Sequence, residues 1–224
     1  MRFRGSPWFA AVALAVLLGL AIQVTVSAGN DEGLFPTAPG RVFNVFCYFT
    51  VQSNILVGVT SGLLFVRPQR ASETFRVLRL AGLAAIVVTF VIYHTALSHL
   101  VDLDGWAKLA DQLLHTVVPV LTVIAWVVVG PRRQAEKRSA WLALLPPAAW
   151  VAFTLVRGEL IDFYPYPFVD VEEYGYPRVA LNIAGVGVLF YALTRGAVAL
   201  DRRLPGEPSP PAADFPPPRA PDTP

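Results

Sequence analysis

The chain has 224 residues, of which 54% are hydrophobic and only 15% are charged, and its formal net charge is +2. Soluble domains carry about 25% charged residues, so this composition excludes an ordinary water-soluble globule and predicts a membrane protein. The single cysteine, Cys47, excludes a disulfide framework within one chain, and basic residues confined to short segments between apolar runs argue against a nucleic-acid partner.

Long apolar segments recur along the whole chain. A helix that crosses a bilayer needs about 20 mostly apolar residues. Such segments occur six times, at Trp8–Ala28, Phe43–Val66, Val77–Leu97, Ala110–Gly130, Ala140–Val156 and Arg178–Leu200. We therefore predict an all-α membrane protein in which residues 1–203 form a bundle of six transmembrane helices. The pair Pro146-Pro147 predicts a kink inside the fifth span, because proline removes a helical hydrogen bond.

The first span has two interpretations. Arg2 and Arg4 before an apolar stretch, with Val26-Ser27-Ala28 after it, resemble a secretory signal with a small-residue cleavage site. The stretch is longer than the ~7–15 apolar residues of a signal core, which favours a retained span. Cleavage would leave five spans and would not change the orientation of the others.

Charged residues alternate between the connections. Basic residues lie at the start, in the second-to-third and fourth-to-fifth connections and after the last span, as Arg2, Arg4, Arg67, Arg70, Arg76, Arg79, Arg132, Arg133, Lys137, Arg138, Arg202 and Arg203. The remaining connections are mostly acidic, with Asp31, Glu32, Asp102, Asp104, Asp111, Glu159, Asp162, Asp170, Glu172 and Glu173. Short cytoplasmic loops collect Lys and Arg, so both termini are expected in the cytoplasm. Abundant Ala, Val, Pro and Arg with only two Lys suggests a GC-rich bacterial genome. For a bacterial chain with these spans we expect the inner (plasma) membrane.

The segment 204–224 is rich in proline and poor in apolar residues. Such a composition builds neither helix nor sheet and has little to bury. We expect it to be a disordered cytoplasmic tail.

Polar residues inside the spans gather toward the end that is predicted to be external. They lie in the second, third, fourth and sixth spans, as Thr50, Asn54, Tyr93, His94, Asp111, His115 and Asn182. At 1.5 Å per residue, Thr50 lies roughly 10 Å and His115 roughly 8 Å inside the outer end of its span. Because polar groups in a membrane span are costly, convergence at one depth predicts a site within the bundle.

Each of these residues also has a simpler interpretation. Threonine in a membrane helix usually bonds its own backbone or packs between helices. Asn54 could join two helices, and His115 could simply reach water at the membrane interface. His94 lies close to the outer loop and could be an interfacial residue. The aromatic and proline-rich loop at residues 162–177 is either an interfacial belt or a lid over the polar residues.

Three short stretches resemble motifs of the bacterial six-span family known as Pr-six-Pr. They are Phe49-Thr50-Val51-Gln52-Ser53-Asn54, Leu114-His115-Thr116-Val117-Val118-Pro119 and Tyr164-Pro165-Tyr166-Pro167-Phe168. That family is similar to the eukaryotic androgen-induced membrane proteins, which hydrolyse fatty acid esters of hydroxy fatty acids with a threonine and a histidine. By motif position the resemblance implies Thr50 and His115 as the catalytic pair.

The resulting hypothesis is a lipid-ester hydrolase that uses no cofactor and takes membrane lipid or a lipid ester as its partner. His115, held by Asp111 four residues earlier, would take the proton of Thr50, and Asn54 or Asn182 would stabilise the oxyanion. Alternatives are a proton or small-solute transporter, a b-type haem protein with His94 and His115 as ligands, and a lipid-binding or structural membrane protein.

Overall fold

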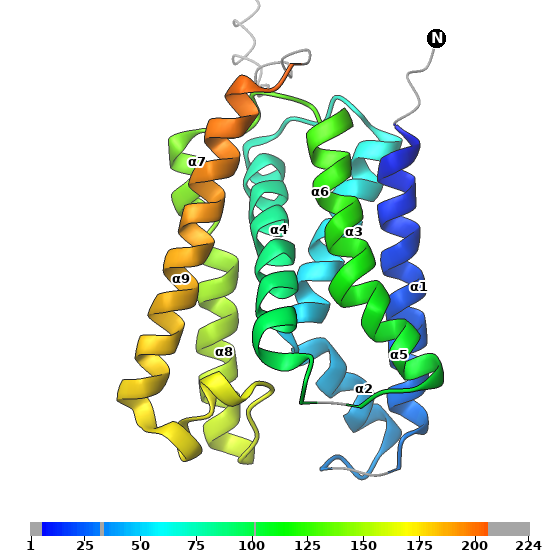
Figure 1. The fold of residues 1–224 in the computed structure, drawn as a ribbon, viewed down its shortest axis with the longest axis vertical. Coiled ribbons are helices and arrows are strands. Elements are labelled where there is room, and N and C mark those ends of the chain that lie inside the picture. Colours follow the sequence, from blue (N-terminus) through cyan, green and yellow to red (C-terminus); the bar gives the residue numbers. More distant parts are fainter. Residues whose placement is uncertain (1–5, 32–33, 101, 206–224) are drawn as a thin grey trace, which may run out of the picture.

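The computed structural model describes residues 6–31, 34–100 and 102–205, and the described chain is helical (Figure 1). Six helices are long and apolar enough to cross a membrane: Pro7–Gly29, Phe49–Val66, Glu73–Leu97, Gly105–Val129, Lys137–Ile161 and Val171–Arg203. This confirms the all-α class and agrees with the prediction of six candidate spans. Residues 206–224, which hold most of the predicted tail, lie outside the described residues.

Several of these spans are built from more than one helical piece. In chain order the elements are α1 (Pro7–Gly29), α2 (Ala38–Cys47), α3 (Phe49–Val66), α4 (Glu73–Ile92), the π-helical turn η1 (Tyr93–Leu97), α5 (Gly105–Gln112), the π-helical turn η2 (Leu113–Val117), α6 (Val118–Val129), α7 (Lys137–Leu142), α8 (Leu145–Ile161), the 3₁₀ turn η3 (Pro167–Val169) and α9 (Val171–Arg203).

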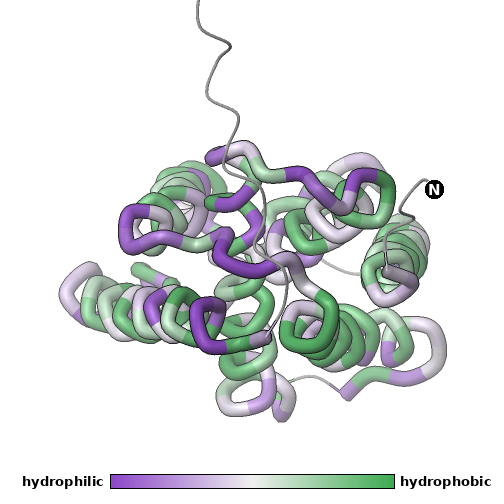
Figure 2. Tube along the Cα trace, turned by 90° about the horizontal axis from the view of Figure 1, so that it is seen from above, coloured by the Kyte–Doolittle hydropathy of each residue, from purple (hydrophilic) through white to green (hydrophobic). Residues whose placement is uncertain are grey.

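The two ends of the bundle differ in charge. Helix α1 begins and α9 ends at the same end, which also holds the α3–α4 and α6–α7 connections (Figure 1). We call this the terminal end; hydrophilic residues gather in its connections (Figure 2). The α1–α2, η1–α5 and α8–α9 connections lie at the opposite end. The predicted basic and acidic connections are thus segregated, while the membrane side that each end faces stays a prediction.

Small residues let the first helix pack closely against its neighbours. A Cβ on Gly58 of α3 would lie 2.8 Å from Val16 of α1, and a Cβ on Gly19 of α1 would lie 2.8 Å from Leu114. Arg41 of α2 then covers the end of α1, donating hydrogen bonds to the carbonyls of Ser27 and Ala28. Helix α1 is therefore packed against the segments that carry the polar residues.

The fifth and sixth spans differ in detail from the sequence prediction. The fifth breaks before its prolines, because α7 ends at Leu142 and α8 begins at Leu145. Pro146 and Pro147 consequently sit in the first turn of α8, where a missing N–H leaves no helical bond unmade. The sixth begins earlier than Arg178, with a kink at Gly175 (φ +70°).

Candidate functional site

A break in the second span places Thr50 at the beginning of a helix. Tyr48 has an extended backbone (φ −75°, ψ 138°), so α2 ends at Cys47 and α3 begins at Phe49. Side chains from distant segments satisfy the backbone groups near the break. The Trp150 indole N–H donates to the Cys47 carbonyl at 2.9 Å, and the Thr50 N–H donates to the Tyr166 hydroxyl at 3.1 Å. Thr50 therefore lies in the first turn of α3, where the helix dipole favours negative charge.

A π-helical turn interrupts the span that carries His115. The N–H of Val118 bonds the carbonyl of Leu113, five residues back. The next bond in this register would join Pro119 to the Leu114 carbonyl, but proline has no N–H. The side-chain amide of Asn54 occupies that place, donating to the Leu114 carbonyl at 3.1 Å. In an α-helix, Pro119 would leave the carbonyl of His115 without a backbone donor. In the π turn the carbonyl without a backbone donor is that of Leu114 instead.

Thr50 and His115, predicted to meet, are joined by a hydrogen bond. The Thr50 Oγ1 lies 3.2 Å from Nε2 of His115, and His115 Nδ1 lies 2.9 Å from Oδ1 of Asp111. Tyr93 donates to the other oxygen of Asp111 at 2.6 Å. Since the ionised carboxylate only accepts, it fixes the proton on Nδ1 and leaves Nε2 free to accept the Thr50 proton.

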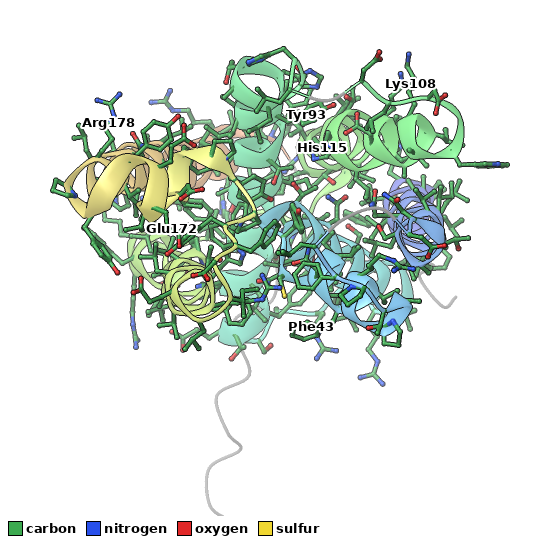
Figure 3. All side chains as sticks on the ribbon, turned by 90° about the horizontal axis from the view of Figure 1, so that it is seen from below. Phe43, Tyr93, Lys108, His115, Glu172 and Arg178 are labelled. Atoms are coloured by element: carbon green, nitrogen blue, oxygen red, sulfur yellow. The ribbon has the colours of Figure 1, made fainter. Side chains whose placement is uncertain are left out.

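This chain of side chains, Thr50–His115–Asp111–Tyr93, is the relay. It lies near the end of the bundle opposite the terminal end. Figure 3, viewed from there, shows Tyr93 and His115 next to each other between the helices. Their rings stack with centroids 3.9 Å apart and an interplanar angle of 14°. Thr50 is 7% exposed and the His115 side chain 18%, so the relay is shielded but reachable.

Tyr166 completes the surroundings of Thr50. Its hydroxyl accepts the Thr50 N–H and lies 3.3 Å from Thr50 Oγ1. Burial raises the pKa of Tyr166 to about 12, so the phenol keeps its proton at neutral pH and can donate it to Oγ1. The proline-rich motif was recognised in the sequence as a possible lid, but nothing local indicated that one tyrosine enters the bundle.

The other predicted residues have different positions. Asn54, fully buried, also donates to the Thr50 carbonyl at 2.8 Å, so it links α3 to η2. Asn182 donates to the Phe168 carbonyl at 2.9 Å and holds the loop that carries Tyr166. His94 contacts Thr116 at 3.0 Å on an exposed face. The structure thus brings Tyr93 and Asp111 together with the pair and leaves His94 and Asn182 outside the relay.

Two cavities meet at Thr50. An apolar cavity of about 290 Å³ lies among α3, α4, α8, η3 and α9. A larger, more polar cavity of about 590 Å³ is lined by residues that include Gln23, Ser27, Asn44, Asp111 and His115. Among the described residues, four line both cavities: Thr50, Tyr93, Leu97 and Tyr166. Thr50 therefore lies between an apolar cavity and a more polar one.

The described residues contain no cluster of three or more His, Cys, Asp or Glu that could hold a metal ion. Both ring nitrogens of His115 already have protein partners. Ligation of a haem iron by His115 would require one of these two contacts to be broken, so the geometry gives that alternative no support.

Compared with known proteins, the chain matches no family model, no curated protein and no solved structure. The resemblance to the Pr-six-Pr family accordingly stays a hypothesis based on three short stretches of sequence.

Proposed function

We propose that this chain is a multi-pass membrane hydrolase that cleaves lipid esters, with Thr50 as nucleophile and His115 as general base. The observation that carries the proposal is the relay, in which a buried threonine hydroxyl, an imidazole and a carboxylate are connected by hydrogen bonds. Nucleophile, base and orienting acid in this order are the arrangement that activates a weak hydroxyl nucleophile.

The reaction has two steps. Thr50 Oγ1 loses its proton to His115 Nε2 and bonds to the ester carbonyl carbon; the bond from that carbon to the alcohol oxygen breaks, and His115 gives the proton to this oxygen. Water then gives a proton to His115 while its oxygen attacks the acyl carbon. The bond to Oγ1 breaks, the proton returns to Thr50, and a carboxylic acid leaves.

The negative charge that forms on the carbonyl oxygen needs donors. Two lie beside Thr50: its own N–H and the hydroxyl of Tyr166, which bond each other in the free protein at 3.1 Å. An oxyanion between them would take both hydrogen bonds. We favour these donors over Asn54 and Asn182, whose amides already bond backbone carbonyls.

The charge pattern supports an orientation for this site. With both termini and the 204–224 tail in the cytoplasm, the relay lies in the outer-leaflet half of the membrane. For a bacterial chain this is the inner membrane, with the polar cavity nearer the external water.

The proposal is tested with purified protein in nanodiscs and a panel of 4-nitrophenyl acyl esters. Thr50→Ala should reduce turnover about a thousandfold or more, because without the nucleophile the rest of the relay has nothing to activate. Thr50→Ser keeps a hydroxyl and should retain much of the turnover. Thr60→Ala is the matched control, because Thr60 lies on the same helix and bonds only the carbonyls of Leu56 and Val57.

Wild-type turnover by Thr50→Ala would exclude this mechanism. The alternative, a transporter or lipid-binding protein that uses the polar cavity, predicts solute flux or lipid binding without hydrolysis in proteoliposomes.

A further inference from the structure

We infer that the apolar cavity binds the acyl chain of the ester and that the alcohol part occupies the polar cavity. This inference rests on the proposed function and states how the ester is oriented relative to the two cavities. Its starting point is the position of Thr50, a residue that lines both cavities.

The position of the general base, His115, determines which cavity takes the alcohol part of the ester and which takes the acyl chain. His115 and Asp111 line the polar cavity and are not part of the apolar one. The general acid must reach the leaving alcohol oxygen, and the base must later reach the attacking water. Both the alcohol and the water are therefore on the His115 side of Thr50, which leaves the opposite side for the acyl chain.

The lining of the apolar cavity suits a hydrocarbon chain. Apart from Thr50 and Tyr166, its polar side chains are already paired: Thr89 bonds Ser53 at 2.9 Å, and the Trp150 indole and the Tyr93 hydroxyl donate to Cys47 and Asp111. Among the described lining side chains, only Thr50 and Tyr166 are thus left to bond a substrate, and the rest of the wall favours hydrocarbon. Along α9 it extends from Ile183 to Phe190, about 10 Å.

Gly187 keeps part of this cavity open. It lines the apolar cavity, and a Cβ at this position would meet no atom within 4 Å. A Cβ here meets no clash, and because Gly187 lines the cavity we expect a larger side chain at this position to take up part of its space. Gly185 is equally unobstructed on the same helix but does not line the cavity, so it provides a matched control.

The test compares Gly187→Leu and Gly185→Leu on 4-nitrophenyl acetate and 4-nitrophenyl palmitate, which share one leaving group. We expect Gly187→Leu to lower kcat/KM for palmitate by about tenfold or more relative to acetate, and Gly185→Leu to leave the ratio unchanged. An unchanged ratio in Gly187→Leu overturns the inference while leaving the hydrolase proposal intact, and is also the result expected if a bulk lipid tail merely fills the cavity.

A second measurement does not depend on turnover. A long-chain fatty acid with a terminal diazirine is cross-linked to the Thr50→Ala protein, and the modified peptides are identified by mass spectrometry. Labelling of cavity residues on α8 and α9, such as Val151 and Val186, supports the acyl site even if no ester is hydrolysed. Labelling confined to α1 and α2, which line the polar cavity, overturns it.

Discussion

Both ends of the bundle bury polar side chains, but they use them differently. At the terminal end Arg132 donates to the carbonyls of Trp126 and Val127 that end α6, and Asp201 accepts the N–H groups of Gln134 and Ala135. These side chains close helix ends and connections, as backbone groups without helical partners require.

At the opposite end the polar side chains bond each other. Thr50, His115, Asp111 and Tyr93 come from three spans, and their chain of hydrogen bonds ends at a hydroxyl on a cavity wall. Burial of a polar group in a membrane helix is therefore a weak sign of chemistry by itself. The stronger sign is an ordered path for a proton that reaches a cavity.

The largest contrast is expected between two aspartates. Asp111→Asn should reduce ester turnover about a thousandfold or more, because an amide cannot hold the Nδ1 proton and stabilise the imidazolium as a carboxylate does. Asp201→Asn keeps an oxygen that can accept the two backbone N–H groups and should leave turnover unchanged. Steady-state kinetics on both variants measures this, and similar turnover in the two would remove the distinction between the ends.

A second experiment tests whether a buried polar residue at the terminal end affects only the stability of the protein and not its turnover. Arg79 is 8% exposed and donates to the Pro131 carbonyl and to Gln134. Arg79→Met removes these two buried, charge-assisted hydrogen bonds and should lower the free energy of unfolding by about 3 kcal/mol. Thermal unfolding in detergent gives the loss of stability, and turnover per folded molecule should stay at the wild-type value. A selective loss of turnover would mean that the terminal end takes part in the reaction.

The smallest of these effects is expected at Tyr166. Tyr166→Phe keeps the ring but removes one oxyanion donor, which should lower kcat about a hundredfold with little change in KM. Tyr176→Phe is the control, because its hydroxyl bonds Glu159 on an exposed face. If both variants kept the wild-type kcat, the charge on the carbonyl oxygen would have to be stabilised by other groups.

The sequence predicted the six candidate spans, because these depend on local composition and on the rise of a helix. It also placed Asp111 beside His115, since four residues make one turn. These features require no knowledge of which helices are neighbours. The depth of the relay in the membrane stays a prediction.

The break at Tyr48 was not predictable in the same way. Neither Gly nor Pro marks it, and Phe43–Val66 is apolar enough to read as one helix. Its backbone groups are satisfied by Trp150 and Tyr166, more than a hundred residues further along the chain. Only the folded bundle shows that these partners are present. The role of Tyr166 could not be predicted for the same reason, because no residue near it in the sequence indicates its contact with Thr50.

The π turn η2 sets the rotation of one half of its span relative to the other. At 3.6 residues per turn, removing a single residue from Leu113–Val117 would rotate one flanking helix by about 100° against the other. With α6 held in the bundle, a deletion after His115 would turn that imidazole away from Thr50. A one-residue gap here in an aligned relative would therefore identify a chain that shares the six spans but has lost the means to activate its threonine.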